Sequence, residues 1–241
     1  MLSRITAVEA RLFFREPGVW LLTILLPTIV LVVVGLLFGT DPDPALGGRR
    51  WIDIFAPSMV VMNLAILGVN TLPARLVKYR EKGVLRRLST TPASPWSLLV
   101  AQLVVNMGVA IVSLALLIIV GNIVLQVPLP KDLIGFAVAF LVGMSALFAL
   151  GLLVAAVAPT TGIATALFVP LFALVMFLGG VYLPRQMLPE VLIRIGDYTP
   201  PGVQGLLDAW SGTSPQLTQL AVMGLITVVA GATASRRFRW E

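Results

Sequence analysis

The residues best equipped for chemistry or binding form one charged segment in the first half of the chain. It reads Lys78-Tyr79-Arg80-Glu81-Lys82-Gly83-Val84-Leu85-Arg86-Arg87-Leu88. A short helix here would carry its charges beside an apolar edge, and Thr91-Pro92 would end it, because proline cannot continue a helix. Such a helix suits a groove on a soluble partner protein. It equally suits anionic lipid, to which each Lys or Arg adds about 1 kcal/mol near the surface.

Groups for catalysis are scarce. The 241 residues include no Cys and no His, which excludes thiolate nucleophiles, imidazole bases and ordinary zinc sites. No G-x-x-x-x-G-K-[ST] sequence is present, so the loop that cradles nucleotide phosphates is missing. The basic residues flank apolar runs instead of forming one stripe with interleaved aromatics, which argues against nucleic acid as a partner. We expect no enzymatic activity, metal or cofactor on this chain.

The elements that position the charged segment are apolar helices. Hydrophobic residues make up 58% of the chain and charged residues 12%, whereas soluble domains are about one quarter charged. A spanning helix needs about 20 apolar residues. Uncharged stretches and the prolines that interrupt them predict six spans, near residues 18–40, 54–74, 98–120, 133–157, 163–183 and 217–234. The expected fold is an all-α, polytopic integral membrane protein with a single transmembrane domain over residues 1–241.

The distribution of Lys and Arg predicts the orientation in the membrane. Twelve of the 17 basic residues fall on the side that holds both chain ends and the charged segment. Because loops rich in Lys and Arg stay in the cytosol, this side is predicted to be cytosolic. We expect a multi-pass protein of the cell membrane with both termini in the cytoplasm.

Two further segments are predicted to lie at the membrane surface. Residues 1–16 repeat Leu2, Ile5, Val8 and Leu12 at helical spacing between arginines, which indicates an interfacial helix in contact with membrane lipid. A plain cytosolic tail is the alternative. The external loop 184–215 contains the one-sided apolar stretch Glu190 to Ile195, which favours short re-entrant helices before the last span. An ordinary extracellular loop fits this pattern as well.

Both informative loops resemble one family. Arg80-Glu81-Lys82-Gly83-x-Leu85-x-Arg87-Leu88, followed by Thr91-Pro92, resembles the loop after the second span in permeases of the ABC transporter type-2 exporter group, which includes the permeases related to daunorubicin resistance. Leu178-Gly179-Gly180-Val181-Tyr182-Leu183-Pro184, Met187-Leu188-Pro189 and Tyr198-Thr199-Pro200-Pro201 are similar to the Pro-rich external stretch of the same family. Many members have Asn-Pro where this chain has Thr199-Pro200.

The resemblance implies that the cytosolic loop 75–96 contains a coupling helix that docks on a separate ATP-binding subunit. Arg80, Glu81 and Arg87 would face that subunit, and Gly83 would allow close approach. ATP and Mg would bind to the partner. The implied coupling residues are Tyr79, Arg80, Glu81, Lys82, Gly83, Leu85, Arg86, Arg87 and Leu88. A second permease subunit, identical or a close paralogue, would complete the transporter.

A substrate path needs apolar walls with a few polar groups. Such residues recur near one face of the second predicted span: Phe55, Met59, Asn63, Ile66 and Asn70. The family lines its path with spans two and five, which implies Phe168, Phe172 and Met176 as further candidates. Helix packing is the alternative for each of these residues. Asn63 and Asn70 would then serve to form interhelical hydrogen bonds, each contributing about 0.6 kcal/mol.

The function expected from these patterns is that of a permease subunit of an ATP-driven exporter. It would move an amphipathic or hydrophobic substrate outward, such as a drug, a lipid or a glycan-like molecule. The predicted spans lack Asp, Glu, Lys and Arg, which disfavours a proton-driven transporter. The alternative is a six-span substrate-binding or scaffold subunit without export activity.

Overall fold

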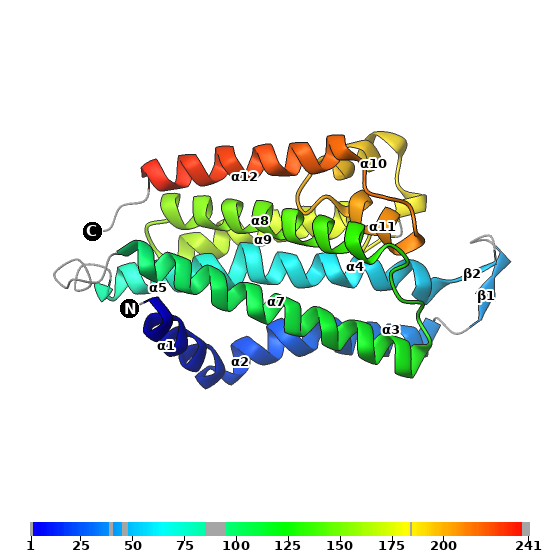
Figure 1. The fold of residues 1–241 in the computed structure, drawn as a ribbon, viewed down its shortest axis with the longest axis horizontal. Helices are drawn as coiled ribbons and strands as arrows, with labels where there is room; N and C mark the ends of the chain where they lie inside the picture. The colour runs from blue at the N-terminus through cyan, green and yellow to red at the C-terminus, as the bar shows by residue number, and fades with distance from the viewer. Residues whose placement is uncertain (1, 39–40, 45–47, 85–94, 184, 238–241) are drawn as a thin grey trace.

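A computed structural model describes residues 2–38, 41–44, 48–84, 95–183 and 185–237. Within these ranges, six helical stretches are long and apolar enough to cross a membrane. They are Pro17–Phe38, Trp51–Glu81, Trp96–Leu125, Leu133–Val157, Thr161–Leu178 and Leu217–Arg237. The predicted all-α fold with six spans is therefore confirmed. The helices lie side by side in an elongated bundle (Figure 1).

The first two spans each contain a widened, π-helical turn. The first consists of α2 (Pro17–Trp20), η1 (Leu21–Leu25) and α3 (Leu26–Phe38), and the second of α4 (Trp51–Ala65), η3 (Ile66–Thr71) and α5 (Leu72–Glu81). In both, a proline follows two residues after the widened turn: Pro27 and Pro73. A proline has no N–H to donate and its ring crowds the carbonyl one turn earlier, so the helix widens locally rather than keeping its regular hydrogen bonds.

The remaining spans are α-helices, and two of them begin at a polar capping residue. They are α7 (Pro95–Leu125), α8 (Leu133–Val157), α9 (Thr161–Leu178) and α12 (Leu217–Arg237). The Asp132 carboxylate caps α8 by accepting from the Gly135 amide at 2.9 Å, and the Thr160 hydroxyl caps α9 by accepting from the Ile163 amide at 3.3 Å. These caps satisfy amide groups that have no partner inside the helix.

The loops divide between two ends of the bundle. The amphipathic helix α1 (Leu2–Arg15), the end of α5, the α8–α9 turn and the end of α12 share one end, which we call the α5 end (Figure 1). The opposite end, the α11 end, carries a two-residue antiparallel pair, β1 (Pro42–Asp43) with β2 (Arg49–Arg50). It also carries the short helices η4 (Arg185–Met187), α10 (Glu190–Asp197) and α11 (Val203–Ser211). Re-entry of these helices into a membrane stays a prediction.

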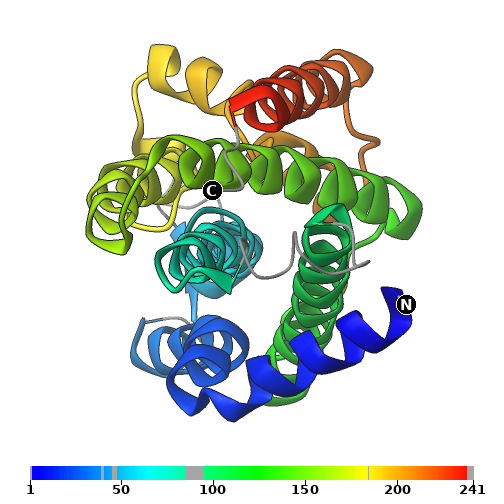
Figure 2. The same cartoon turned by 90° about the vertical axis from the view of Figure 1, so that its left-hand side faces the viewer.

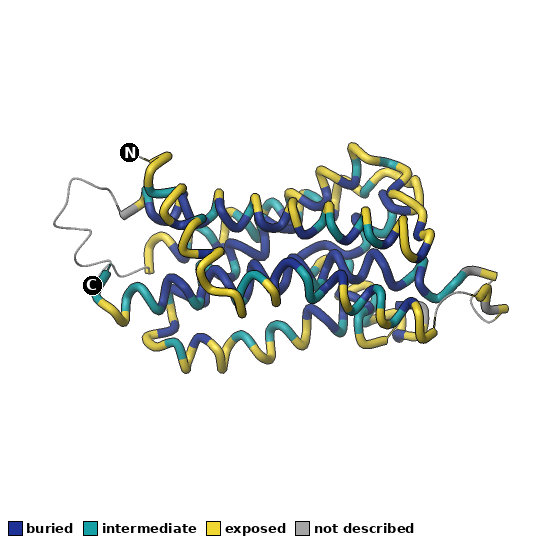
Figure 3. Tube along the Cα trace, turned by 90° about the horizontal axis from the view of Figure 1, so that it is seen from below, coloured by how far each residue is buried: buried dark blue, intermediate teal, exposed yellow. Residues whose placement is uncertain are grey.

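The second span forms the core of the bundle. Its most apolar stretch is 83% buried, whereas those of the fifth and sixth spans are each 22% buried. Viewed from the α5 end, α4 and α5 lie at the centre with other helices on several sides (Figure 2). Exposed residues concentrate on the outer faces of the surrounding helices (Figure 3). Many of these are large and apolar, including Leu36, Ile123 and Val228, as expected for helices that face lipid.

The helix boundaries differ from the predictions in most spans. The second span runs from Trp51 to Glu81 rather than over 54–74, so the predicted loop 75–96 begins seven residues too early. The helix continues past its first two basic residues, which contact the N-terminal segment: Arg75 lies over the Phe13 ring and Lys78 pairs with Glu16. The third span is longer than 98–120, and the sixth continues to Arg237. The fourth, over 133–157, is confirmed.

The fifth span ends at Leu178, five residues before the predicted end. Gly179 and Gly180 follow it, and Gly180 has a φ of +76°, a left-handed conformation that ends helices and suits glycine. The chain then turns into the segment that carries Arg185. This arginine is buried, forms an ion pair with Asp197, and donates to the Ile193 carbonyl at 3.3 Å.

Candidate functional site

The last two turns of α5 bind α1 on one side. The Tyr79 hydroxyl lies 3.1 Å from each carboxylate oxygen of Glu9, and the Gln102 amide donates to the same carboxylate at 3.1 Å. The Arg75 guanidinium lies 4.9 Å from the centre of the Phe13 ring. Lys78 Nζ lies 3.1 Å from Glu16 Oε1. Helix α1 is therefore attached to the end of the second span through Tyr79–Glu9 and Arg75–Phe13, the residue after α1 through Lys78–Glu16, and Glu9 also bonds to Gln102 on α7.

Glu9 is buried, with 4% of its surface exposed. Burial raises the pKa of its carboxyl because desolvation disfavours the charged form, although the contacts with Tyr79, Arg75 and Gln102 pull the pKa down. Most of the residues that were predicted to contact lipid are exposed, and another face of this helix is buried. Leu2, Val8 and Leu12 are exposed, while Glu9 and Phe13 are buried against the bundle. The Ile5, Glu9 and Phe13 spacing of four residues was the signal that could have identified this face.

On its other side, the end of α5 binds the turn between α8 and α9. Arg80 Nη1 donates to the Ala155 carbonyl at 3.2 Å, and Arg80 Nη2 donates to the Ala158 carbonyl. Glu81 Oε1 accepts from the Thr161 amide at 2.8 Å and lies 3.3 Å from the Thr161 hydroxyl. A cation thus meets the carboxyl end of α8 and an anion meets the amino end of α9, which is the favourable arrangement for both helix dipoles.

The chain turns directly after Glu81. Lys82 is exposed, and Gly83 has a φ of +64°, which suits a residue without a side chain. The predicted coupling residues Leu85, Arg86, Arg87 and Leu88 lie outside the described residues. The structure therefore places Tyr79, Arg80 and Glu81 in the last turn of the second span rather than in a separate helix. That they contact an ATP-binding subunit stays a prediction.

A cavity of about 560 Å³ lies beside α5, between the first and second spans. Its walls combine apolar and polar side chains from both π-helical turns, and they include Leu22, Thr23, Ile66, Asn70 and Thr71. Glu16, Arg75, Lys78 and Thr161 line it toward the α5 end. Two of the predicted path residues, Ile66 and Asn70, are therefore brought together at this cavity. The cavity is large enough for a small amphipathic molecule.

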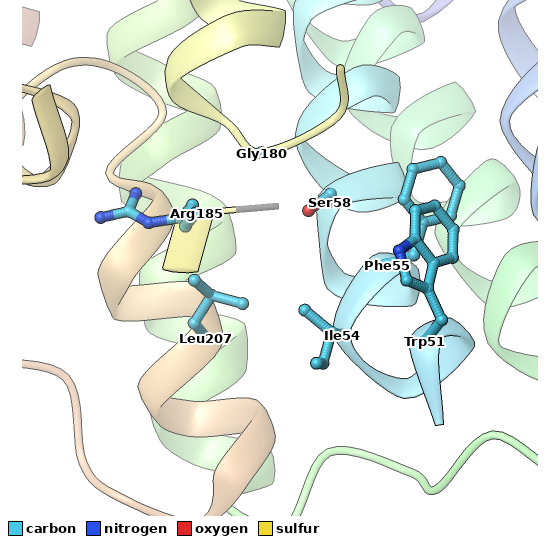
Figure 4. Close-up of a pocket in the computed structure, with 7 residues that line it drawn as sticks. All are labelled: Trp51, Ile54, Phe55, Ser58, Gly180, Arg185 and Leu207. Atoms are coloured by element: carbon cyan, nitrogen blue, oxygen red, sulfur yellow. The ribbon is translucent and has the colours of Figure 1, made fainter. Parts of the chain in front are cut away.

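A much smaller cavity of about 20 Å³ lies near the α11 end, which is room for about one water molecule. Figure 4 shows its lining, which includes Phe55, Ser58, Gly180 and Arg185. The predicted path residue Phe55 lies here and stacks on Trp51, with the ring centres 4.5 Å apart. This space is too small for an amphipathic substrate.

The other predicted path residues lie within the bundle. Met59 and Asn63 are fully buried, and Met176 is 1% exposed. Asn63 Nδ2 donates to the Ser113 hydroxyl, so it does bond between helices. Phe168 and Phe172 are half-buried, with ring centres 5.0 Å apart. A role of these residues in transport stays a prediction.

Comparison with known families matches residues 2–201 of the chain to the ABC-2 type transporter family. This range contains α1, the first five spans and the segment that leads into α11. A search of curated proteins found no match. Members of this family are membrane permeases that work with an ATP-binding subunit rather than hydrolysing ATP themselves. Because the match covers most of its length, this chain belongs to the ABC-2 type transporter family and is the permease component of an ABC transporter.

Proposed function

We propose that this chain exports an amphipathic or hydrophobic substrate, such as a drug, a lipid or a glycan-like molecule, across the cell membrane. A separate ATP-binding subunit, carrying ATP and Mg, would drive the transport. A second permease subunit, identical or closely related, would complete the complex. The α5 end would face the cytosol together with both termini.

The observation that carries this proposal is the double role of the end of the second span. Asn70, Ala74 and Lys78 line the 560 Å³ cavity, and the same helix leads directly into the predicted coupling segment. A push on that segment would therefore move a cavity wall. The wall combines apolar side chains such as Leu22 and Ile66 with polar ones such as Asn70, which suits a substrate with both characters.

The ends of the bundle support the proposed orientation. Arg4, Arg11 and Arg15 are exposed on α1, and Arg236 and Arg237 are exposed at the end of α12, so the α5 end is rich in basic residues. Basic residues favour the cytosolic side of a membrane. The exposed Leu2, Val8, Leu12 and Phe14 on α1 suit contact with the lipid interface. Helices α10 and α11 would then lie at the outer leaflet.

Docking of the ATP-binding subunit can be tested by co-purification. The permease would be produced together with a candidate ATP-binding subunit of an ABC transporter from the same genome. Arg86→Ala combined with Arg87→Ala should reduce the amount of this subunit that co-purifies. Arg236→Ala combined with Arg237→Ala removes the same charge from α12 and should leave it unchanged. Full retention by the first double variant would contradict the proposed coupling segment.

Transport can be tested in inside-out membrane vesicles with daunorubicin as the probe. ATP should drive its accumulation, and Ala74→Trp should reduce it by filling the cavity while the ATP-binding subunit stays attached. Val33→Trp is the matched control, because Val33 is 49% exposed on α3, away from the cavity. Binding of the probe without any ATP-driven movement would instead favour a substrate-binding or scaffold subunit.

A further inference from the structure

We propose that Arg80 and Glu81 are positioning residues that act inside the chain, fastening the α8–α9 turn to the end of the second span. The transport role of this link rests on the proposed function. The resemblance implied that both side chains face the ATP-binding subunit. Their contacts in the structure are instead with the backbone of the α8–α9 turn and the hydroxyl of Thr161.

The two side chains bind complementary groups. The α8–α9 turn presents carbonyl groups where α8 ends and amide groups where α9 begins, and neither set has partners within its own helix. Arg80 donates to the carbonyls of Ala155 and Ala158, and Glu81 accepts from Thr161. Hydrogen bonds of charged groups to helix ends are stronger than neutral ones. Adjacent residues of opposite charge therefore hold both sides of one helical hairpin.

The link reaches the large cavity through Thr161. This residue lines the cavity and is also the residue that Glu81 holds. The α5 residues Arg75 and Lys78 also line the cavity, and they contact Phe13 and Glu16 on the opposite side of α5. When the segment after Glu81 moves, the beginning of α9 therefore moves with α5, and the cavity walls change together. Lys82, the residue that caps the end of α5, is exposed.

The link can be tested by spin labelling, because the chain has no native cysteine. Labels would be placed at Lys82→Cys and Gly162→Cys. Both sites are exposed, and a Cβ at Gly162 meets only the Thr160 hydroxyl, at 3.9 Å. The purified permease in lipid nanodiscs should give one narrow distance distribution. Glu81→Ala and Arg80→Gln should each abolish the narrow component.

Two variants separate this link from general loosening of the α5 end. Glu81→Gln keeps an acceptor oxygen and loses the charge, so it should broaden the distribution less than Glu81→Ala. Glu16→Ala removes a carboxylate that contacts the other side of α5, through Lys78, and should leave the distribution narrow. If Glu81→Ala does not fold, Glu81→Gln and Arg80→Gln still decide the outcome. An unchanged distribution in the folded Glu81 and Arg80 variants would overturn the proposal.

Co-purification with the ATP-binding subunit distinguishes this proposal from the proposed function. Glu81→Ala should retain the subunit and its ATP hydrolysis, while daunorubicin transported per ATP falls. Loss of the subunit together with a narrow label distribution would mean that Glu81 faces the partner, and the proposal would be wrong. If the wild-type permease bound no such subunit, the proposed function would fail, and the label distances alone would still test the link.

Discussion

Gly151→Ala should destabilise the bundle strongly, because α8 meets the second span backbone to backbone at this position. A Cβ at Gly151 would lie 3.1 Å from the carbonyl carbon of Gly68 and 3.3 Å from Cδ of Pro73, and nearer still to the Gly68 carbonyl oxygen. Gly68 also packs closely on α8, since a Cβ at Gly68 would lie 2.7 Å from Cβ of Leu147 and 3.1 Å from its carbonyl carbon. Neither side of this contact is a flexible side chain that could move away.

The size of the effect follows from the overlap. Carbon atoms pack best at about 3.5–4.0 Å, so the added methyl group would force α8 and η3 apart by about 1 Å at the contact. Extra methyl groups in a packed interior usually cost about 1–3 kcal/mol. Since the opposing atoms belong to the backbone, we expect the upper end, about 3 kcal/mol. The shift would also displace Ile66 and Asn70, which line the large cavity from η3.

The assay is reversible unfolding of the purified protein by SDS in mixed detergent micelles, followed by the loss of helical circular dichroism. Gly108→Ala in α7 and Gly231→Ala in α12 are matched controls, because a Cβ at either site meets nothing within 4 Å. Both should unfold close to wild type or up to about 1 kcal/mol more stably, since alanine favours helix over glycine. If Gly151→Ala unfolded at the same SDS concentration as these controls, the backbone contact would not exist as described.

Three further predictions concern buried and capping charges. Burial raises the pKa of the Glu9 carboxyl above its ordinary value of 4.5. Protonation of Glu9 therefore adds to the stability of the folded protein, fully below pH 4.5 and less and less as the pH rises through the raised pKa. Glu9→Gln should flatten this pH dependence of the melting temperature. Arg185→Met leaves the partly buried Asp197 carboxylate without its ion-pair partner and should lower the free energy of unfolding in SDS by about 3 kcal/mol. Adding Asp197→Leu should restore part of this stability. Asp132→Ala removes the cap of α8 and should cost about 1 kcal/mol, with Asp132→Asn near wild type.

The number of spans could be predicted because apolar length and proline position are local properties of the sequence. The fourth span was predicted at its observed bounds, since Pro130 and Lys131 precede it and Pro159 follows it. Membrane helices must satisfy their own backbone hydrogen bonds, so long apolar runs between such residues have few alternatives. The same reasoning divided residues 133–183 correctly into two helices, with the turn at Ala158 to Thr160.

The contacts of the charged residues could not be predicted in this way. Arg75 ended the predicted second span because an isolated charge is costly in a membrane. In the structure it lies over Phe13, 62 positions away in the sequence, so helix α5 continues past it. The resemblance implied that Glu81 faces a partner protein, which stays a prediction, and no local pattern indicated that its Oε1 accepts from Thr161, 80 positions away. Such pairs depend on how helices are arranged, and no local pattern contains that information.

The two π-helical turns explain why polar residues of the second span differ in their roles. At η1, the Ser113 hydroxyl lies 3.2 Å from the Thr23 carbonyl and 3.1 Å from that of Ile24, and Asn63 donates to Ser113. At η3, the Thr71 hydroxyl donates to the Ile66 carbonyl at 3.1 Å. A widened turn in lipid is tolerated when side chains satisfy its carbonyls. Asn63 therefore stabilises, through Ser113, the widened turn η1, whose residues Leu22 and Thr23 line the cavity. Asn70, about two turns nearer the α5 end, lines the cavity directly.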